Sequence, residues 1–410
     1  MTTQINNENK KLNFSNEREQ SQTCLNSAEH KKNQGRKVLN VPNLRFPEFQ
    51  GEWEKCKLGE LTTKVGSGST PKGGNAVYTS VGHCFVRSQN VGMGYLILDD
   101  IAHIDDDIHQ KHKATELNED DVLLNITGAS IGRTAIATKE IEGGNVNQHV
   151  CIIRANSKVS PKFLCNYIQT KIIQNYIQSL QTGGSREGLN FEQIRSFPMS
   201  LPNIAEQNKI AQLLDKLNER IATQNKIIDK LQSLIKGIGK QLFMDNQNWR
   251  TVKIGELLRI GNGKDYKRLG IGKIPVYGTG GQMLLVNDYL YDGESVCIGR
   301  KGTIDTPMFL NGKFWTVDTL FYTYDFKDVL PKFCYYLFLQ INWKLYNEGT
   351  GVPSLSKSTI ENIKVKIPSI EQQHNICSIL DCYEHKTKSE EQILELYLSE
   401  KQYLLRQMFI

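Results

Sequence analysis

The sequence lacks the motifs by which several classes of nucleotide-dependent and hydrolytic enzyme are known. Its four Gly-Lys pairs are followed by Gln, Asp, Ile and Phe, whereas a phosphate-binding loop needs Ser or Thr there. No Pro-Pro occurs, so the chain has no Asp/Asn-Pro-Pro-Tyr/Phe segment, which an amino-group DNA methyltransferase would need. HExxH and Gly-x-Ser-x-Gly are also missing. We therefore expect no catalysis by this chain alone.

Long apolar runs and paired cysteines are missing as well. No run approaches the roughly 20 apolar residues of a membrane helix, and the start, MTTQINNENKKLNF, has no apolar signal segment. The 9 cysteines are odd in number and form no CxxC pair. They predict reduced thiols packed in the core, and hence a cytoplasmic protein, rather than disulfides, a zinc ribbon or nucleophiles.

The length and net charge of the chain say little about its domains and partners. The 410 residues suggest two or three domains. The 50 Lys and Arg exceed the 44 Asp and Glu by 6, an excess that permits a nucleic-acid partner without establishing one.

An internal repeat gives the organisation of the chain. Residues 194–243 align with residues 360–409 without a gap, at an offset of 166. Upstream, residues 62–150 and 258–317 share few identities. The matched anchors are Pro161-Lys162-Phe163 with Pro331-Lys332-Phe333, Trp53 with Trp249, Leu201-Pro202 with Ile367-Pro368, and Gln207 with Gln373. A duplicated frame that holds two dissimilar fillings predicts two modules related by a pseudo-twofold axis, because two units this large do not make a solenoid.

We predict five segments on this basis. They are a disordered polar tail at 1–40, a first module at 41–200, a long helix at 201–245, a second module at 246–366 and a second long helix at 367–410.

The two long helices carry an apolar seam with spacings of 3 and 4 residues, which is typical of a coiled coil. The seam is formed by Leu214, Leu217, Ile221, Gln224, Ile228 and Leu231 in the first helix, and by Leu380, Tyr383, Leu394 and Tyr397 in the second, where Glu390 and Lys401 interrupt it. Residues 201–243 carry 7 basic and 4 acidic residues, and residues 367–410 carry 4 and 7. Opposite charge favours an antiparallel pair of the two helices over packing of each on its own module.

Two features of the sequence leave alternatives open. Gly237 and Gly239 either allow a close helix contact or loosen the end of the first helix. The run from His103 to His112 contains the groups of a metal site, but no periodicity brings them to one face, so we expect a solvated acidic loop.

Both modules contain loops rich in Gly, Ser, Thr, Arg, Asn and Gln. Arg, Asn and Gln side chains read base edges, and Gly, Ser, Thr and Lys suit contacts to phosphates. Any one loop also fits ordinary turn chemistry, and recurrence in both modules is what favours DNA binding. The candidates are Thr70, Lys72, Arg87, Gln89, Ser130, Arg133, Asn147, Gln148, Ser185 and Arg186 in the first module, and Lys264, Tyr277, Thr279, Arg300, Lys301, Asp318 and Thr319 in the second.

Residues 41–410 resemble the specificity subunits of type I restriction–modification systems. In the first half the matching residues are Leu44-Arg45-Phe46-Pro47-Glu48-Phe49 with Trp53, Thr70-Pro71, Thr127-Gly128-Ala129-Ser130-Ile131-Gly132-Arg133, Asn147-Gln148-His149, and Leu201-Pro202 with Glu206-Gln207 and Ile210. In the second half they are Gly299-Arg300 with Gly302, Asp318-Thr319, and Ile367-Pro368 with Glu371-Gln372-Gln373.

The resemblance implies a mixed α/β fold with two target-recognition domains, separated by a pair of long antiparallel coiled-coil helices. Each domain would read one half of a bipartite, asymmetric site on double-stranded DNA. The helices would set the spacing and dock two methyltransferase subunits, which restriction subunits then join in a cytoplasmic defence against foreign DNA. No cofactor is expected in this chain, because S-adenosylmethionine, ATP and Mg²⁺ would bind the partner subunits. The alternatives are a stand-alone coiled-coil DNA-binding or scaffold protein, and a nuclease that uses the segment from His103 to His112.

Overall fold

The computed structural model describes residues 39–181, 188–244 and 248–410. Nearly all of the expected tail, and the candidates Ser185 and Arg186, lie outside the described residues. The described chain divides into two compact units. The first unit consists of the chain up to Gln212 together with Leu404–Ile410, and the second unit is Leu213–Tyr403. Among the described residues, no helix is both long and apolar enough to cross a membrane.

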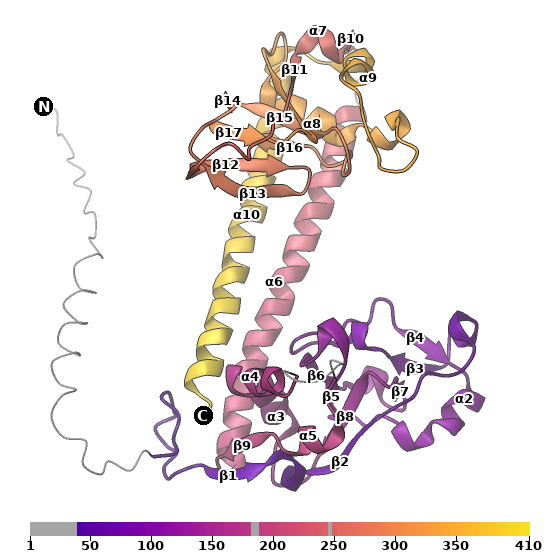
Figure 1. The fold of residues 1–410 in the computed structure, drawn as a ribbon, viewed down its shortest axis with the longest axis vertical. Coiled ribbons are helices and arrows are strands. Elements are labelled where there is room, and N and C mark those ends of the chain that lie inside the picture. Colours follow the sequence, from indigo (N-terminus) through magenta and orange to yellow (C-terminus); the bar gives the residue numbers. More distant parts are fainter. Residues whose placement is uncertain (1–38, 182–187, 245–247) are drawn as a thin grey trace, which may run out of the picture. The chain divides into compact units, whose positions relative to one another are not determined.

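The first unit, drawn in indigo to magenta in Figure 1, is built around small sheets. Its strands are β1 (Glu54–Lys57), β2 (Thr62–Ser67), β3 (His83–Val86), β4 (Ala102–Ile104), β5 (Val122–Asn125), β6 (Thr134–Ile136), β7 (Asn145–Val146), β8 (Val150–Ala155) and β9 (Pro198–Leu201). Its helices are α2 (Asp106–Lys111), α3 (Pro161–Ile168), α4 (Lys171–Ser179) and α5 (Phe191–Arg195), together with the start of α6 (Ile204–Met244).

The second unit has a similar succession of strands and helices. Its strands are β10 (Arg250–Lys253), β11 (Arg259–Asn262), β12 (Ile271–Gly278), β13 (Gly281–Val286), β14 (Tyr291–Asp292), β15 (Ser295–Gly299), β16 (Met308–Leu310), β17 (Lys313–Thr316), β18 (Leu320–Tyr324) and β19 (Lys364–Ile367). Its helices are α7 (Ile254–Leu257), α8 (Pro331–Gln340), α9 (Lys357–Asn362), most of α6 and most of α10 (Ile370–Gln407).

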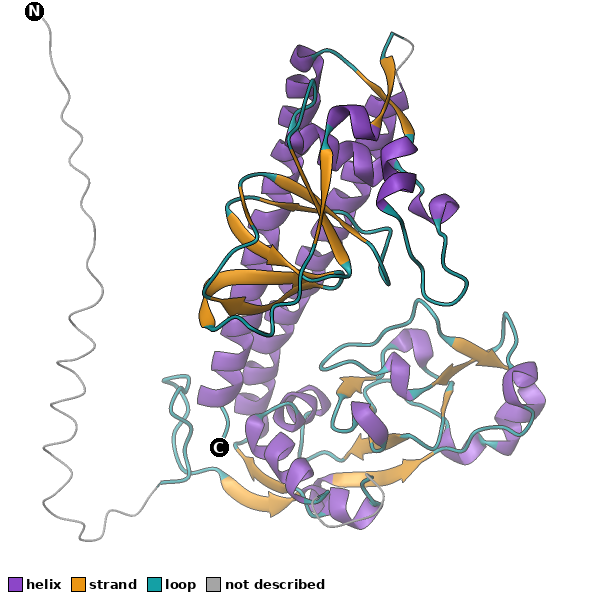
Figure 2. Ribbon diagram, turned by 45° about the horizontal axis from the view of Figure 1, so that its top comes forward, coloured by secondary structure: helices purple, strands orange, loops and turns teal. Residues whose placement is uncertain are grey.

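The two units share one strand topology although their sequences differ. The sheet β2-β8-β5-β6 of the first unit corresponds to β11-β18-β15-β16 of the second. Figure 2 shows the strands of both units in orange. Likewise β4-β3-β7 corresponds to β13-β12-β17, and β3 pairs with β7 in parallel as β12 does with β17. The short sheets β1-β9 and β10-β19 also correspond. The mixed α/β class and the internal duplication are therefore confirmed.

Two equivalent glutamines explain why the repeat is clearest at the start of each long helix. The Gln207 amide donates to the carbonyls of Lys158 and Pro202 and accepts from the Ser160 N–H, at 2.9–3.1 Å. The Gln373 amide bonds to the matching backbone groups of Asp328, Pro368 and Leu330, at 2.8–3.1 Å. Both side chains are buried. Each glutamine thus ties the first turn of a long helix to the loop before α3 or α8.

The last residues of the chain complete the first unit. The ring of Phe409 lies 5.1 Å from that of Phe163, which in turn packs against Trp53 at 6.0 Å. In the second unit, Phe243 at the end of α6 lies 5.3 Å from Phe333 and 5.7 Å from Trp249. Since Phe243 and Phe409 are related by the repeat, the end of each long helix caps the same kind of aromatic cluster.

The long helices α6 and α10 pair side by side in the second unit and run antiparallel, as predicted (Figure 1). The α6 helix begins at Ile204, because residues 198–201 pair with β1. Of the expected seam residues, Leu214, Leu217, Ile228 and Leu380 are buried, and Ile221, Leu231, Tyr383, Leu394 and Tyr397 are half-buried.

The two helix glycines differ in their surroundings. A Cβ at Gly239 would lie 3.2 Å from Nε2 of Gln340 on α8, whereas none at Gly237 would meet a neighbour within 4 Å. Because α6 continues to Met244, Gly239 serves a close helix contact and does not mark a frayed end.

The prediction of a solvated acidic loop at residues 103–112 is wrong. His103 lies in β4, and Asp105 caps α2 by accepting the N–H of Ile108 at 2.8 Å. Acidic side chains in the first turn favour such a helix. His109 is 2% exposed and hydrogen-bonds to Asn145 at 2.7 Å, so this segment includes a packed core residue.

Candidate nucleic-acid interface

Four loops of the first unit meet at one end of its sheets. They follow β2, β3, β5 and β7, and the strand register places these ends together. Three backbone hydrogen bonds join the loops, from Gly68 N–H to the Asn147 carbonyl, from Asn147 N–H to the Val86 carbonyl, and from Ile126 N–H to the His149 carbonyl, at 3.0–3.2 Å. All the described first-module candidates lie on these loops: Thr70, Lys72, Arg87, Gln89, Ser130, Arg133, Asn147 and Gln148.

A chain of side-chain hydrogen bonds crosses this loop cluster. The Thr70 hydroxyl donates to the Gln148 carbonyl oxygen, and the Gln148 amide lies 3.0 Å from Nε2 of His149. Since an amide N–H can only donate, Nε2 accepts, and Nδ1 carries the proton that is donated to the Thr127 hydroxyl at 2.6 Å. Thr127 and His149 were missed as site residues, although both lie within the motifs that contain Ser130 and Gln148.

The other first-module candidates differ in whether their side chains are already bonded within the protein. Arg87 donates to the Asp100 carbonyl at 3.0 Å, and Gln89 donates to the Asp100 carboxylate at 3.0 Å. Both side chains are therefore hydrogen-bonded within the protein. Asn147 is buried and accepts the His149 N–H, a role in loop geometry. Arg133 is exposed and has no ion pair within the described part of the chain.

The second unit builds the same loop cluster with different side chains. Its joining bonds run from Lys264 N–H to the Thr316 carbonyl, from Val317 N–H to the Tyr277 carbonyl, and from Arg300 N–H to the Thr319 carbonyl, at 2.8–3.0 Å. The bonds of Val317 and Arg300 are the counterparts of those of Asn147 and Ile126, and the bond of Lys264 joins the same two loops as that of Gly68, one residue out of register. The second-module candidates Lys264, Tyr277, Thr279, Arg300, Lys301, Asp318 and Thr319 are all brought to this end.

A glycine is required at the same place in each cluster. A Cβ at Gly68 would lie 1.7 Å from the Val146 carbonyl oxygen, and one at Gly263 would lie 1.8 Å from that of Val317. Only glycine lets these loops pass so close to the neighbouring strand.

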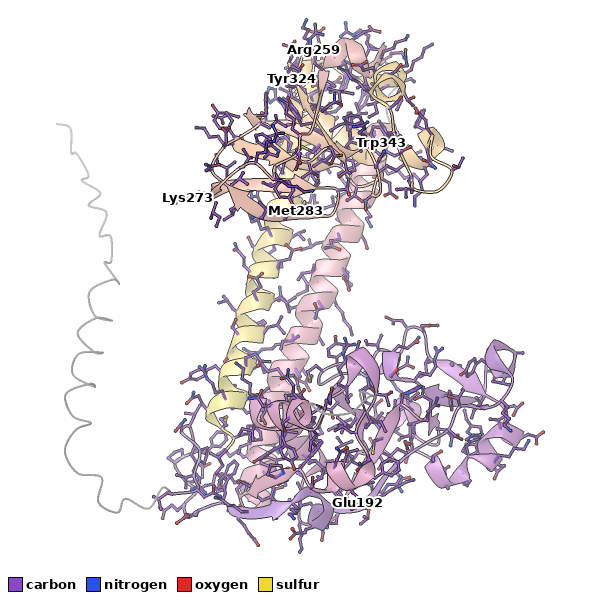
Figure 3. The ribbon with its side chains drawn as sticks, in the orientation of Figure 1. Glu192, Arg259, Lys273, Met283, Tyr324 and Trp343 are labelled. Atoms are coloured by element: carbon purple, nitrogen blue, oxygen red, sulfur yellow. The ribbon has the colours of Figure 1, made fainter. Side chains whose placement is uncertain are left out.

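A hollow of about 490 Å³ opens in the second cluster. It is lined by Tyr266, Gly278–Met283 and Val317–Thr319. Met283 of the β12–β13 hairpin is 54% exposed (Figure 3). Three glycines in the lining (278, 280 and 281) leave the backbone open to close approach by a ligand.

The charges of the two modules differ. Residues 41–200 carry 16 Lys and Arg against 17 Asp and Glu, whereas residues 246–366 carry 16 against 11. The second module is therefore the better suited to a polyanion.

The described residues supply neither a metal-binding group nor a reactive thiol at these clusters. No set of three or more His, Cys, Asp or Glu among them is placed to hold a metal ion. Burial raises the pKa of the Cys151 and Cys297 thiols to about 12, so both remain protonated and unreactive near neutral pH.

Comparisons with known proteins agree with this architecture. A putative type I restriction enzyme specificity subunit, MjaX, from Methanocaldococcus jannaschii is 23% identical over 413 residues, covering 87% of this chain and 93% of the relative. The MjaVIII specificity subunit of the same organism is 23% identical over 412 residues, covering 85% and 90%.

Solved structures share the fold. The crystal structure of a type I restriction–modification S subunit from M. genitalium has a TM-score of 0.59 at 17% identity, covering 90% of this chain and 99% of that one. A structure from a study of assembly and conformational transition in the type I system has a TM-score of 0.52 at 15% identity, covering 86% and 96%.

The model of one family matches both halves of the chain. This is the type I restriction modification DNA specificity domain, and it matches residues 50–233 and 246–396. Because these matches cover most of the chain, the protein belongs to the family of type I restriction–modification DNA specificity subunits.

Proposed function

We propose that this chain gives DNA-sequence specificity to a type I restriction–modification complex. Each module reads one half of a bipartite, asymmetric site on double-stranded DNA, and the paired helices set the gap between the halves. The observation that carries the proposal is the pair of loop clusters, which are joined by corresponding backbone hydrogen bonds but present different side chains. A common frame with unlike reading groups suits a site with two unlike halves.

The flank of each long helix supports docking of two copies of one partner. Every seventh residue beside the seam of α6 is Leu213, Arg220, Ile227 and Leu234, and the counterparts on α10 are Ile379, Lys386, Ile393 and Glu400. Leu213 and Ile227 are 36% and 37% exposed, and Ile379 and Ile393 are 41% and 37% exposed. Such flanking positions of a two-stranded coiled coil usually carry Glu or Lys. Matched, exposed aliphatic residues on both helices therefore suit two equivalent methyltransferase subunits.

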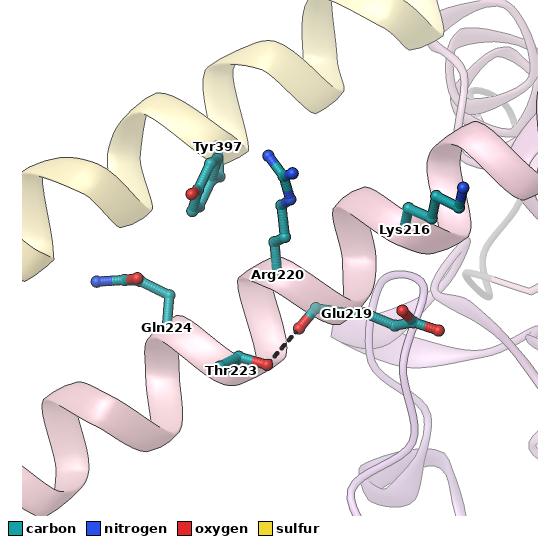
Figure 4. A pocket seen from close by; sticks show the side chains of 6 residues that line it. All are labelled: Lys216, Glu219, Arg220, Thr223, Gln224 and Tyr397. Atoms are coloured by element: carbon teal, nitrogen blue, oxygen red, sulfur yellow. Dashed lines mark hydrogen bonds between the residues drawn. The ribbon is translucent and has the colours of Figure 1, made fainter.

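The flank of α6 also offers a polar contact. Arg220 extends toward Tyr397 of α10 over an open hollow of about 430 Å³, lined also by Lys216, Glu219, Thr223 and Gln224 (Figure 4). Arginine and tyrosine are both enriched among the residues that contribute most to binding at protein interfaces.

We place the chemistry of the complex on its partners. The methyltransferase subunits would bind S-adenosylmethionine and receive the target base, flipped out of the duplex. Restriction subunits would supply the functions that need ATP and Mg²⁺. The chain itself acts by recognition and assembly in the cytoplasm, consistent with its lack of nucleotide-binding and catalytic motifs.

The test is to express the chain with its methyltransferase partner in a host without DNA methylation, and to map methylated bases by long-read sequencing. We expect one split motif with two unlike halves, absent when either chain is omitted. A continuous motif, or methylation by the partner alone, would contradict the proposal. Sequence-specific binding by the isolated chain at full affinity would favour a stand-alone DNA-binding protein.

A further inference from the structure

The second loop cluster holds polar side chains that the protein itself does not use. Gln282 and Asp318 line the hollow, and within the described residues neither side chain has a hydrogen bond or ion pair. In the first cluster, by contrast, the counterpart of Asp318 is Gln148, and its side chain accepts a hydrogen bond from the Thr70 hydroxyl. The free groups of the second cluster are therefore available to a ligand.

Three basic residues lie on loops that adjoin Asp318, and none forms an ion pair with it. Lys264, Arg300 and Lys301 sit on loops bonded to residues 316–319, and none forms an ion pair among the described residues. The guanidinium of Arg300 donates to the Asp318 backbone carbonyl at 3.4 Å rather than to its carboxylate. The carboxylate is thus an unpaired acceptor on a surface otherwise suited to phosphate.

The turn that carries Asp318 is fixed on both sides. Leu320 N–H donates to the Val317 carbonyl at 2.9 Å, and the N–H groups of Arg300 and Lys301 both donate to the Thr319 carbonyl, at 2.8 and 3.3 Å. The backbone of Asp318 is thus already ordered, so less conformational freedom is lost on binding than for a residue on a flexible loop.

The chemistry of a carboxylate limits what it can contact on DNA. It accepts hydrogen bonds only, and it is repelled by phosphate and by base acceptors such as guanine O6 and N7 or thymine O4. The donors on base edges are the exocyclic amino groups, which are N6 of adenine and N4 of cytosine in the major groove and N2 of guanine in the minor groove.

We propose that Asp318 is a specificity-determining residue of the second module, and that it accepts a hydrogen bond from the exocyclic amino group of one base in the half-site read by that module. This proposal rests on the function proposed above. Gln282 and the exposed Met283, at the rim of the same hollow, contact the neighbouring base pairs. Lys264 and Lys301, on the adjoining loops, contact the flanking phosphates.

The first test maps methylation by the complex that contains Asp318→Ala. We expect one position of one half-site to become degenerate while the other half-site stays unchanged. The isosteric Asp318→Asn, which can donate as well as accept, should alter the same position and guards against misfolding of the alanine variant. The matched control is Asp292→Asn, which removes an exposed carboxylate of the same unit outside the hollow.

The second test uses duplexes in which single amino groups of that half-site are removed. Purine replaces adenine, 2-pyrimidinone replaces cytosine, and inosine replaces guanine. Removing the correct amino group should weaken binding by the unmodified complex on the order of ten- to a hundredfold. The same change should have no effect on the complex that contains Asp318→Ala.

Two outcomes would overturn the role of Asp318 while leaving the proposed function intact. One is a split motif that both Asp318 variants leave unchanged, and the other is a uniform loss of methylation with no change of motif. Failure of the unmodified complex to methylate any split motif would instead overturn the proposed function, and the role of Asp318 with it.

Discussion

Gln224 of α6 and Glu390 of α10 are counterparts in the internal repeat, and they also contact each other. The Gln224 amide donates to both the Glu390 carboxylate and its backbone carbonyl, at 2.5 and 3.0 Å. Both residues are buried in the helix pair. Contact between repeat-related residues places them at the point where the two helices are equivalent, so this pair fixes the register in which α6 and α10 meet.

Replacing either member of this pair alone should destabilise the protein. Gln224→Leu leaves the buried Glu390 carboxylate without its cross-helix donor, and Glu390→Leu leaves the buried amide with only the backbone carbonyl of residue 390 as an acceptor. The double variant restores a continuous apolar seam and should be more stable than either single variant. Chemical unfolding of all four proteins, analysed as a double-mutant cycle, measures the coupling, and additive effects would contradict the pairing.

The same pair predicts a pH dependence. The Lys386 ammonium and the Gln224 amide hold the pKa of Glu390 below its ordinary value of 4.5. A carboxyl whose pKa is lower in the folded state stabilises the fold above its ordinary pKa, and this contribution is lost as the pH falls through the lowered value. The difference in melting temperature between the unmodified protein and Glu390→Gln should therefore shrink between about pH 5 and pH 3. A difference that stays constant over this range would contradict the linkage.

The two buried glutamines at the helix starts should each hold one unit together. Gln207→Ala and Gln373→Ala each remove three hydrogen bonds and leave buried backbone groups unpaired. We expect each to lower the free energy of unfolding by about 1–3 kcal/mol. The exposed neighbours give the controls Asn208→Ala and Gln372→Ala, which should have little effect. An equally small effect at Gln207 and Gln373 would show that the repeat is maintained there for another reason.

The sequence predicts the frame of this protein well, because the frame is carried by side chains. Gln207, Gln373 and the heptad seam are visible as matched letters at a fixed offset. The common topology of the modules is not visible, because the bonds that join the loops, such as Asn147 to Val86 and Val317 to Tyr277, are made by backbone atoms that leave no mark in the sequence. In the sequence, Glu390 interrupts the apolar seam. Its pairing with Gln224 could not be predicted, because pairing across two helices depends on the register in which they meet.

Arg133 and Arg300 lie on corresponding loops of the two modules and should act on different half-sites. Arg133→Ala should weaken recognition of the half-site read by the first module by about 1–3 kcal/mol, and Arg300→Ala should do so for the other half-site. Competition binding of the complex to duplexes with single base changes measures the effect. If either change lowers affinity equally for all sequences, that arginine contacts phosphate and reads no base. Lys139→Ala, an exposed cation of the first unit away from the loop cluster, is the control.

The exposed aliphatic residues beside the seam should each support one methyltransferase subunit. Glutamate at both Leu213 and Ile227 should remove one subunit, and glutamate at both Ile379 and Ile393 should remove the other, since each buried aliphatic side chain contributes about 1.5–3 kcal/mol. Mass measurement of the assembled complex reports the stoichiometry. Ser233→Glu and Ser399→Glu are matched controls, because these exposed residues are repeat counterparts on the outer face of the helices. Retention of both subunits in the double variants would exclude these flanks as docking sites.

The length of the helix pair should determine the gap in the DNA site. Leu231 lies seven residues after Gln224, and Tyr383 lies seven before Glu390, so the antiparallel register places Leu231 and Tyr383 opposite one another. Seven residues inserted after Lys230, together with seven after Tyr383, preserve both the heptad seam and the Gln224–Glu390 pair. The pair becomes longer by about 10 Å at 1.5 Å per residue, which corresponds to about three base pairs. The methylated motif should keep both halves with a gap longer by about that number, whereas insertion into α6 alone should abolish methylation because the seams no longer match. An unchanged gap in the doubly extended protein would mean that the helices do not set the spacing.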